Sequence, residues 1–166
     1  DKRFMLEESL RMPFVVRHPG EIAPGTVLED IITNVDFAEL FLDYAGAEIP
    51  ASMQGRSFRA NLRGRPPADW PDAMYYHYWT HSQERPSHYG IRTKDHKLIY
   101  YYGLVRMGRQ PDECWELYDL RSDPLELRNR IHEPKYRAVI ADLKQQLEDL
   151  RRETGDTQDP LLRPRD

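Results

Sequence analysis

The feature that most constrains this sequence is a series of four short segments rich in aromatic residues. They cover residues 73–79, 89–93, 97–102 and 115–120, and tyrosine is their most frequent residue. Aromatic and β-branched residues are enriched in strands, so each segment is predicted to be a β-strand. The four residues 93–96 suit a hairpin turn, which predicts that residues 89–92 pair antiparallel with residues 97–101. The sequence therefore predicts a small antiparallel sheet.

A helix is predicted after this sheet, beginning at Pro134. Its apolar residues recur every three or four positions and form one stripe, made of Tyr136, Ile140, Leu143, Leu147 and Leu150. We expect this stripe to cover the sheet. Residues 123–126 combine Asp, Pro and Glu in the order of a capping box, which predicts a short helix there. Residues 103–112 are expected to form a loop, and the tail beyond Gly155 is expected to be frayed or to lie on the surface.

The first third of the chain has a different pattern. Residues 14–17 form a short run with two β-branched valines, which predicts a buried strand leading into a turn at residues 18–20. A helix is predicted over residues 35–44, capped by Thr33 or Asn34 and ended by Gly46. One more helical turn is expected within residues 57–62. The Pro-rich stretch 63–71 then interrupts all periodicity and predicts a subdomain boundary.

Composition excludes several classes of protein. The 166 residues include 24 Lys and Arg against 28 Asp and Glu, a net charge of −4 that disfavours a strongly basic nucleic-acid binder. No apolar run approaches the roughly 20 residues of a membrane-spanning helix. The single cysteine, Cys114, has no partner for an internal disulfide. The chain opens at Asp1 without an initiator Met or signal segment, so we expect it to begin within a longer protein.

No catalytic motif is complete in this chain. Cys114 stands in a predicted strand without a basic neighbour, which predicts a buried and inert thiol. His77 and His81 are four residues apart, but on a strand this spacing separates them by about 13 Å, too far for one metal ion. Glu7 and Glu8 are adjacent and point about 100° apart on a helix, so we interpret them as charges at the start of a helix or as structural hydrogen-bonding groups rather than a glycosidase pair.

Several motifs resemble the type I sulfatases of the alkaline phosphatase superfamily. Lys2 followed by Met5-Leu6-Glu7-Glu8-Ser9 and by Arg11-Met12-Pro13 resembles the segment after the family's metal-binding Asp and His, where a lysine precedes a Tyr-Glu-Glu-Ser-like turn. Leu6 stands where the family usually has tyrosine. The similarity continues, in order and spacing, through residues 36–40, 54–58, 89–99, 115–120 and 123–126. Residues 76–78 and 88–90 look most like N-acetylglucosamine-6-sulfatases and related glycosaminoglycan sulfatases.

This resemblance implies a fold and a domain organisation. The implied fold class is α/β, here an α+β fragment: the end of an alkaline-phosphatase-like α/β layer, followed by a small antiparallel sheet packed by a C-terminal helix. Residues 1–65 are expected to be the C-terminal end of the catalytic domain. Residues 72–152 are expected to form the sheet subdomain with its helix, and residues 153–166 a tail.

The resemblance also implies an activity, the hydrolysis of sulfate esters in sulfated sugars or glycosaminoglycans. The family uses a formylglycine made from a Cys/Ser-x-Pro-x-Arg motif and a calcium ion held by carboxylates, and this sequence contains neither. An N-terminal sulfatase region is therefore expected as a partner, and the isolated chain is expected to be inactive. Besides the sulfated carbohydrate, neither nucleic acid nor membrane is expected, and a homo-oligomer is left open. The family suggests a periplasmic, secreted or lysosomal location.

Three residues are candidates for the site. Lys2 matches the family lysine that contacts the sulfate group, where a compact ammonium stabilises negative charge. His77 and His88 flank aromatic strands and are candidates for contacting the sugar, because histidine can hydrogen bond to a sulfate oxygen or a hydroxyl. Arg92 is interpreted as a surface charge of the sheet.

Two other functions stay open at this stage. One is a non-catalytic module that binds an anionic glycan through aromatic residues and arginines. The other is a phosphatase or phosphonate hydrolase of the same superfamily, which would share this scaffold.

Overall fold

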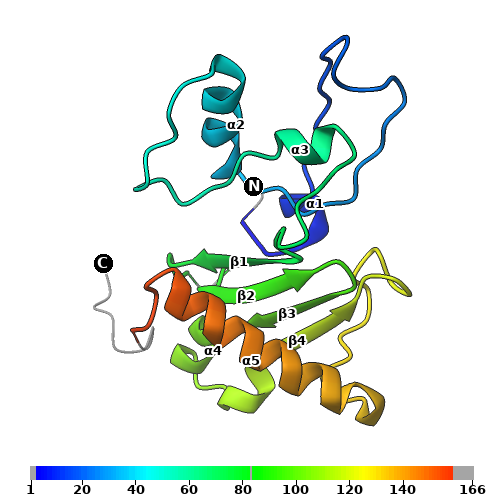
Figure 1. The fold of residues 1–166 in the computed structure, drawn as a ribbon. Coiled ribbons are helices and arrows are strands. Elements are labelled where there is room, and N and C mark those ends of the chain that lie inside the picture. The colour runs from blue at the N-terminus through cyan, green and yellow to red at the C-terminus, as the bar shows by residue number, and fades with distance from the viewer. Residues whose placement is uncertain (1–2, 83, 159–166) are drawn as a thin grey trace. The chain divides into compact units, whose positions relative to one another are not determined.

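A computed structural model describes residues 3–82 and 84–158 of the chain (Figure 1). They divide into two compact units. The first, called the sheet unit here, combines Asp1–Met12 with Ala73–Asp166, and the second, the middle unit, is Pro13–Asp72. The N-terminal segment thus packs with strands that follow it by more than sixty residues in the sequence.

The sheet unit is built on four antiparallel strands in the order β1-β2-β3-β4. The strands are β1 (Ala73–Tyr78), β2 (His88–Thr93), β3 (His96–Tyr100) and β4 (Trp115–Asp119). Arg92 pairs with Lys97 and Tyr89 with Tyr100, which confirms the predicted hairpin and its register. All four strand predictions are confirmed to within two residues at each end.

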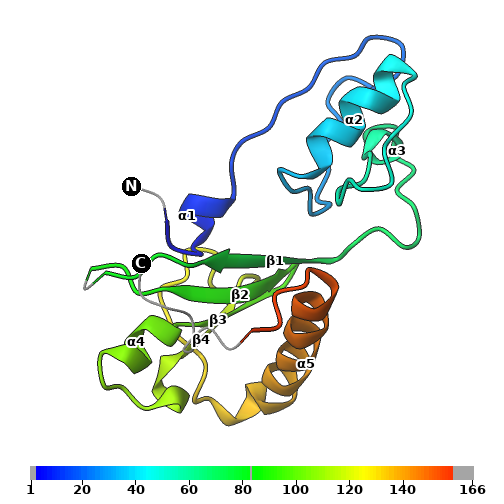
Figure 2. The same ribbon diagram turned by 90° about the vertical axis from the view of Figure 1, so that its left-hand side faces the viewer.

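One face of the sheet is covered by the long helix α5 (Arg137–Glu153), which follows the 3-10 turn η2 (Pro134–Tyr136). Leu143 and Leu147 of α5 are buried together with Ile91, Leu98 and Leu117 of the strands. Figure 2 shows α5 lying across this face. The predicted apolar stripe and its role as the cover of the sheet are confirmed.

The opposite face carries the N-terminal segment and the short helix α1 (Glu7–Leu10), and Figures 1 and 2 both place α1 across the sheet from α5. Met5 is fully buried there and packs with Ile99, Tyr101 and Tyr118. Gly90 lies directly below it: a Cβ on Gly90 would be only 2.7 Å from the Met5 sulfur and 2.4 Å from the Leu98 carbonyl oxygen. Only glycine allows this close approach.

Two expectations for the connections are wrong. Residues 123–126 form a turn instead of a helix, because the Asp123 carboxylate accepts the amides of Leu127 and Arg128 while Glu126 reaches Lys97. Residues 103–112 are not one loop: they contain most of α4 (Tyr102–Arg106) and the start of η1 (Pro111–Cys114). Burial of Tyr102 in the core of the sheet and the capping box of Gln110 with Glu113 organise these two turns.

The middle unit contains α2 (Asp36–Ala45) and α3 (Arg59–Leu62), which confirm both helices predicted in this region. Leu40, Phe58 and Leu62 form its core. Gly46 ends α2 in the left-handed conformation with φ 66°, as predicted.

Three further expectations are corrected. Residues 14–17 form no strand: Val15 is 93% exposed, and within the middle unit the described residues contain no strand to pair with it. Neither Thr33 nor Asn34 caps α2; the N-cap residue is Val35, and the Asp36 carboxylate accepts the amide and hydroxyl of Thr33. Asp156, in the expected surface tail, is buried.

Within the described part of the chain, no helix combines the length and the apolar character that crossing a bilayer requires.

The packing of α5 leads to a first prediction. Replacing Leu147 with Ala leaves a cavity between helix and sheet, and we expect a loss of about 2–5 kcal/mol in the free energy of unfolding. Urea denaturation of the full-length protein measures this loss. The matched control is Leu127→Ala, since Leu127 is 77% exposed and its truncation is expected to cost less than about 0.5 kcal/mol. Equal losses in the two variants would contradict this account of the core.

Candidate functional site

A buried cluster of charges joins the N-terminal segment to the sheet. The Lys97 side chain of β3 is fully buried, and its Nζ lies 2.9 Å from Glu7 Oε1 and 2.6 Å from Glu126 Oε1. Arg92 of β2 adds a contact of 3.0 Å between its Nη2 and Glu7 Oε2. Two cations and two carboxylates thus neutralise one another, as a buried ion cluster requires. Arg92 is therefore not the surface charge that the sequence predicted.

Glu126 occupies an unusual backbone position in this cluster. Among the described residues it is the one non-glycine residue with positive φ, at 55°, which costs about 1–3 kcal/mol. Its second carboxylate oxygen accepts the Glu7 backbone amide at 2.6 Å. The carboxylate therefore bridges the buried ammonium and the first turn of α1, and these contacts offset the cost of the strained backbone.

The charges in this cluster shift the acidity of Glu7. Burial by itself raises the pKa of the Glu7 carboxyl, but the hydrogen bonds and charges of Arg92 and Lys97 outweigh burial and hold the pKa below its usual range. Glu7 is therefore ionised at neutral pH. The interpretation of Glu7 as a structural hydrogen-bonding group is confirmed.

Two tyrosines of β1 hold the residues just before Met5. The Tyr76 hydroxyl donates to the Arg3 carbonyl oxygen at 3.0 Å, and Arg3 Nη1 donates to the Tyr78 hydroxyl at 3.3 Å. The candidate Lys2 lies outside the described residues. Its covalent neighbour Arg3 is thus attached to β1 on the face that carries α1.

His88 lies on this same face, enclosed by aromatic rings. The rings of Phe4, Tyr76, Tyr78 and Tyr101 all lie within 6 Å of it, and His88 is 1% exposed. Burial lowers the pKa of its imidazole, so the ring is neutral at pH 7. Its Nδ1 lies 2.8 Å from the Pro86 carbonyl oxygen, which only accepts, so this nitrogen carries the proton. Nε2 is left as an acceptor with no hydrogen-bond partner in the described part of the structure.

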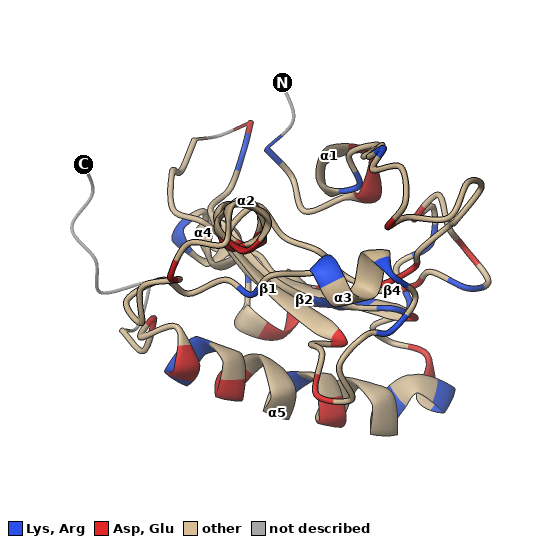
Figure 3. Cartoon of the chain, turned by 45° about the horizontal axis from the view of Figure 1, so that its top comes forward, with Lys and Arg blue, Asp and Glu red and all other residues tan. Residues whose placement is uncertain are grey.

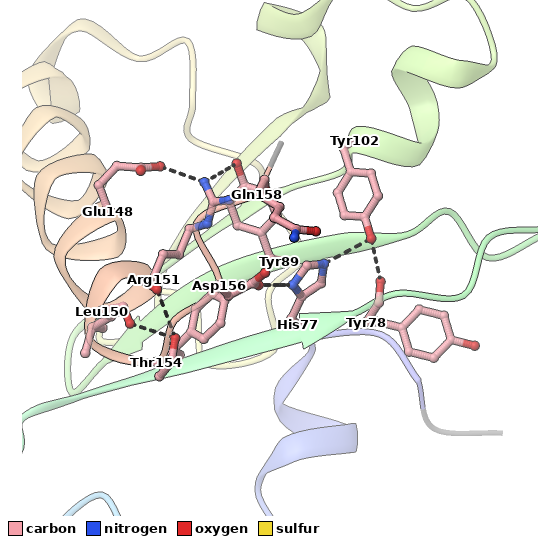
Figure 4. A network of polar contacts seen from close by, with 11 residues as sticks. His77, Tyr78, Tyr89, Tyr102, Glu148, Leu150, Arg151, Thr154, Asp156 and Gln158 are labelled. Atoms are coloured by element: carbon pink, nitrogen blue, oxygen red, sulfur yellow. Dashed lines mark hydrogen bonds and ion pairs between the residues drawn. The ribbon is translucent and has the colours of Figure 1, made fainter. Parts of the chain in front are cut away.

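His77 lies on the opposite face, under the end of α5. Its Nδ1 hydrogen bonds with Asp156, and its Nε2 lies 3.0 Å from the Tyr102 hydroxyl, as Figure 4 shows. The Tyr75 hydroxyl approaches the same ring. Because His77 pairs with Tyr89 and Tyr78 with His88 across β1 and β2, the two histidines point to opposite sides of the sheet. The structure therefore does not bring them together.

The sequence reasoning missed the partners of His77. Arg151 of α5 lies over the Tyr89 ring at 4.5 Å and donates to the Gln158 carbonyl oxygen at 3.1 Å, which holds the chain beyond α5 close to the sheet (Figure 4). Asp156 reaches His77 from this same stretch. No local sequence pattern indicates that Asp156 is a partner of His77. The separation of the two histidines could have been predicted, because the strand register alone places them on different faces.

The described residues do not fit the metal or the nucleophile of the sulfatase family. They contain no group of three or more His, Cys, Asp or Glu side chains arranged to hold a metal ion. Cys114 is buried, its Sγ donates to the Gln110 carbonyl oxygen, and burial raises the pKa of its thiol. It also lacks the surrounding Pro and Arg of the formylglycine motif.

The middle unit has one cavity of note, about 380 Å³ in volume and lined by Gly20, Glu21, Arg63 and Arg65. Glu21 pairs with Arg63 at 2.9 Å and with Arg59 at 2.8 Å. The hydrogen bonds of these two arginines lower the pKa of Glu21, so its negative charge offsets theirs. The cavity is thus no simple anion site.

The fold is shared with solved structures of hydrolases. A protein in complex with its substrate, D-glucosamine-2-N,6-O-disulfate, superposes with a TM-score of 0.85 at 38% identity, over 98% of this chain and 32% of that one. A phosphonate monoester hydrolase from Silicibacter pomeroyi superposes with a TM-score of 0.65 at 25% identity, over 82% of this chain and 28% of the other. The fold is that of the C-terminal part of a sulfatase-like hydrolase.

The family follows from the sequence comparison. A model of the family described as N-sulphoglucosamine sulphohydrolase, C-terminal, matches residues 1–153, and the chain belongs to this family. An N-acetylglucosamine-6-O-sulfatase from Bacteroides thetaiotaomicron is 43% identical over 160 residues, covering 94% of this chain and 27% of the relative. An arylsulfatase from Clostridium perfringens is 29% identical, over 81% of this chain and 26% of its own length. The chain thus spans little more than a quarter of these relatives. The predicted membership of the sulfatase family and the predicted fold class are confirmed.

The depressed pKa of Glu7 predicts how stability depends on pH. A carboxyl whose pKa is lower in the folded state stabilises the fold above its unfolded pKa, about 4.3, and this contribution is lost as pH falls through the folded value. Glu7→Gln is expected to cost about 1.5–3 kcal/mol at pH 7, because a charged hydrogen-bonding group is lost. We expect the stability difference between wild type and variant to shrink as pH falls below about 4.3.

Urea denaturation at pH values from 7 down to 3 measures this difference. Glu8→Gln is the control, since Glu8 is the next residue in α1 and lies outside the cluster. A difference that stayed constant down to pH 3 would show that Glu7 is not held ionised by Lys97 and Arg92.

Proposed function

We propose that this chain is the C-terminal part of a sulfatase that hydrolyses 6-O-sulfate esters of glucosamine-type sugars. The observation that carries the proposal is the 43% identity to an N-acetylglucosamine-6-O-sulfatase over 94% of the chain. The likeness to the structure solved with a glucosamine disulfate supports the same class of substrate.

In this proposal the chain supports the reaction and does not complete it. The described residues supply neither a metal site nor the formylglycine motif, so calcium and the nucleophile are assigned to parts of the enzyme outside this chain. Residues 1–65 are proposed to complete the catalytic domain and residues 72–152 to form the sheet subdomain, although Asp1–Met12 belong to the same compact unit as the sheet.

The chain's own contribution is proposed to be binding and charge stabilisation. Lys2 places its ammonium against the sulfate group, where negative charge must be held in the transition state. His88 accepts a hydrogen bond from a sugar hydroxyl through Nε2, because Nδ1 already donates to Pro86. His77, the other candidate for contacting the sugar, lies on the opposite face with both ring nitrogens hydrogen bonded to Asp156 and Tyr102, so the proposal assigns the sugar contact to His88.

The likeness to a phosphonate monoester hydrolase favours a second candidate, hydrolysis of phosphonate esters on the same scaffold. The identity of 25% to that protein is lower than the 43% to the sulfatase, so sulfate is the preferred assignment. A glycan-binding module is less favoured, because α5 carries both acidic and basic side chains along its length rather than a basic stripe (Figure 3).

Sulfate release by the full-length protein tests the proposal. N-acetylglucosamine-6-sulfate is expected to be hydrolysed, and Lys2→Ala is expected to lower kcat/KM by about 10²–10³, the effect of removing one group that stabilises transition-state charge. Lys135→Ala is the matched control, because Lys135 is exposed and its contacts, 3.6 Å to Glu133 and 4.7 Å to the centre of the Tyr136 ring, lie just before α5. Hydrolysis of a phosphonate monoester without hydrolysis of any sulfate ester would overturn the assignment.

The proposed role of His88 gives a separate prediction. His88→Phe keeps an aromatic ring inside the enclosure but removes Nε2, so KM for the sulfated sugar is expected to rise about fivefold, the effect of one lost hydrogen bond. kcat is expected to change little. His132→Phe serves as the control, since His132 is exposed on the loop before η2. An unchanged KM in His88→Phe would remove His88 from the sugar site.

A further inference from the structure

A set of contacts on one face of the sheet holds the residues that follow Lys2 in the sequence, Arg3 to Glu7. We infer that Tyr76 and the cluster formed by Glu7, Lys97 and Glu126 are positioning residues that hold the N-terminal segment, and with it Lys2, in place for sulfate binding. This inference rests on the proposed function, in which Lys2 contacts the sulfate.

The first contact is next to Lys2 in the chain. Tyr76 donates its hydroxyl hydrogen bond to the carbonyl oxygen of Arg3 at 3.0 Å. Arg3 directly follows Lys2 in the sequence, and this hydrogen bond holds its backbone against β1. Tyr78, two residues along β1 and therefore on the same face, meets the Arg3 guanidinium.

The second contact is Met5, which fixes the depth of the segment. The Met5 side chain is fully buried and packs directly on Gly90. Any side chain at position 90 would collide with the Met5 sulfur and displace it. The segment thus lies in direct contact with β2, and its distance from the sheet is set by packing rather than by hydrogen bonds alone.

The third contact is the charge cluster. Helix α1 has four residues, too few to be stable without tertiary contacts. Its first residue, Glu7, is held through the side chain by Lys97 and Arg92 and through the backbone amide by Glu126. Strands β2 and β3 and the turn after β4 therefore all act on the same short helix.

Glu126 gives independent support. Its φ of 55° is a conformation in which glycine is at ease and glutamate is strained. A glutamate at this position is explained by what its carboxylate does, which is to hold the buried ammonium of Lys97 and the amide of Glu7. The strained backbone therefore indicates that Glu126 is present for the contacts of its carboxylate.

A double-mutant cycle in the full-length enzyme tests the inference. Tyr76→Phe removes the hydrogen bond to Arg3 and keeps the ring that packs beside His88. We expect it to lower kcat for sulfate release about fivefold, with KM changing less. In the Lys2→Ala background the same substitution is expected to change kcat less than about twofold, because a residue that acts through Lys2 has no effect once Lys2 is gone.

Tyr136→Phe is the matched control, since it removes a tyrosine hydrogen bond of 2.7 Å to Asp119 in the part of the sheet unit covered by α5. It is expected to leave kcat unchanged. A fivefold effect of Tyr76→Phe that persists in the Lys2→Ala background would overturn the inference. A Tyr76→Phe single variant with the kcat of the wild type would also overturn it.

Amide hydrogen exchange supplies a readout that does not depend on activity. In Glu126→Gln, the amides of residues 7–10 are expected to exchange faster, while those of β2 and β3 keep their protection. Unchanged exchange in α1 overturns the inference even in an active sulfatase. An enzyme that releases no sulfate defeats the proposed function instead, and the exchange result then still decides whether the cluster anchors the segment.

Discussion

The structure of the sheet unit depends on the burial of one ammonium group. Lys97 has no exposed surface, and a lone charge in that position would be very unfavourable. Two carboxylates from distant parts of the chain, Glu7 and Glu126, must therefore reach it. Their convergence closes the N-terminal segment and the turn after β4 onto β3. The interaction explains why residues separated by more than a hundred positions form one unit.

Strand alternation then gives the two faces of the sheet different roles. One face is apolar, is covered by α5 and contains His77 in a network with Asp156 and Tyr102. The other face receives Met5 and α1 and contains His88 among aromatic rings. The two histidines flank similar aromatic segments in the sequence, yet they are separated by the sheet itself.

In the proposed function, this arrangement supports a catalytic centre that is built largely by other parts of an enzyme. The family match extends over residues 1–153, while the relatives are several times longer. The fold has a TM-score of 0.85 to a structure solved with a glucosamine disulfate, and its packed sheet lies directly below the N-terminal segment. In the same proposal, a packed sheet suits a short segment that presents one side chain to the substrate.

The sequence by itself determined the elements whose signals are local. The aromatic strands, the hairpin at residues 93–96 and the apolar stripe of α5 all follow from periodicity and turn length, and the order of the sulfatase-like motifs indicated the family. Tertiary structure alone decided what depends on distant partners. Residues 123–126 form a turn rather than a helix because the Glu126 carboxylate binds the Lys97 ammonium. Residues 14–17 form no strand because the described residues around them include no strand with which they pair. Asp156 is buried because it hydrogen bonds with His77. Local patterns cannot show which charges meet across the fold, since burial and pairing are properties of the assembled sheet.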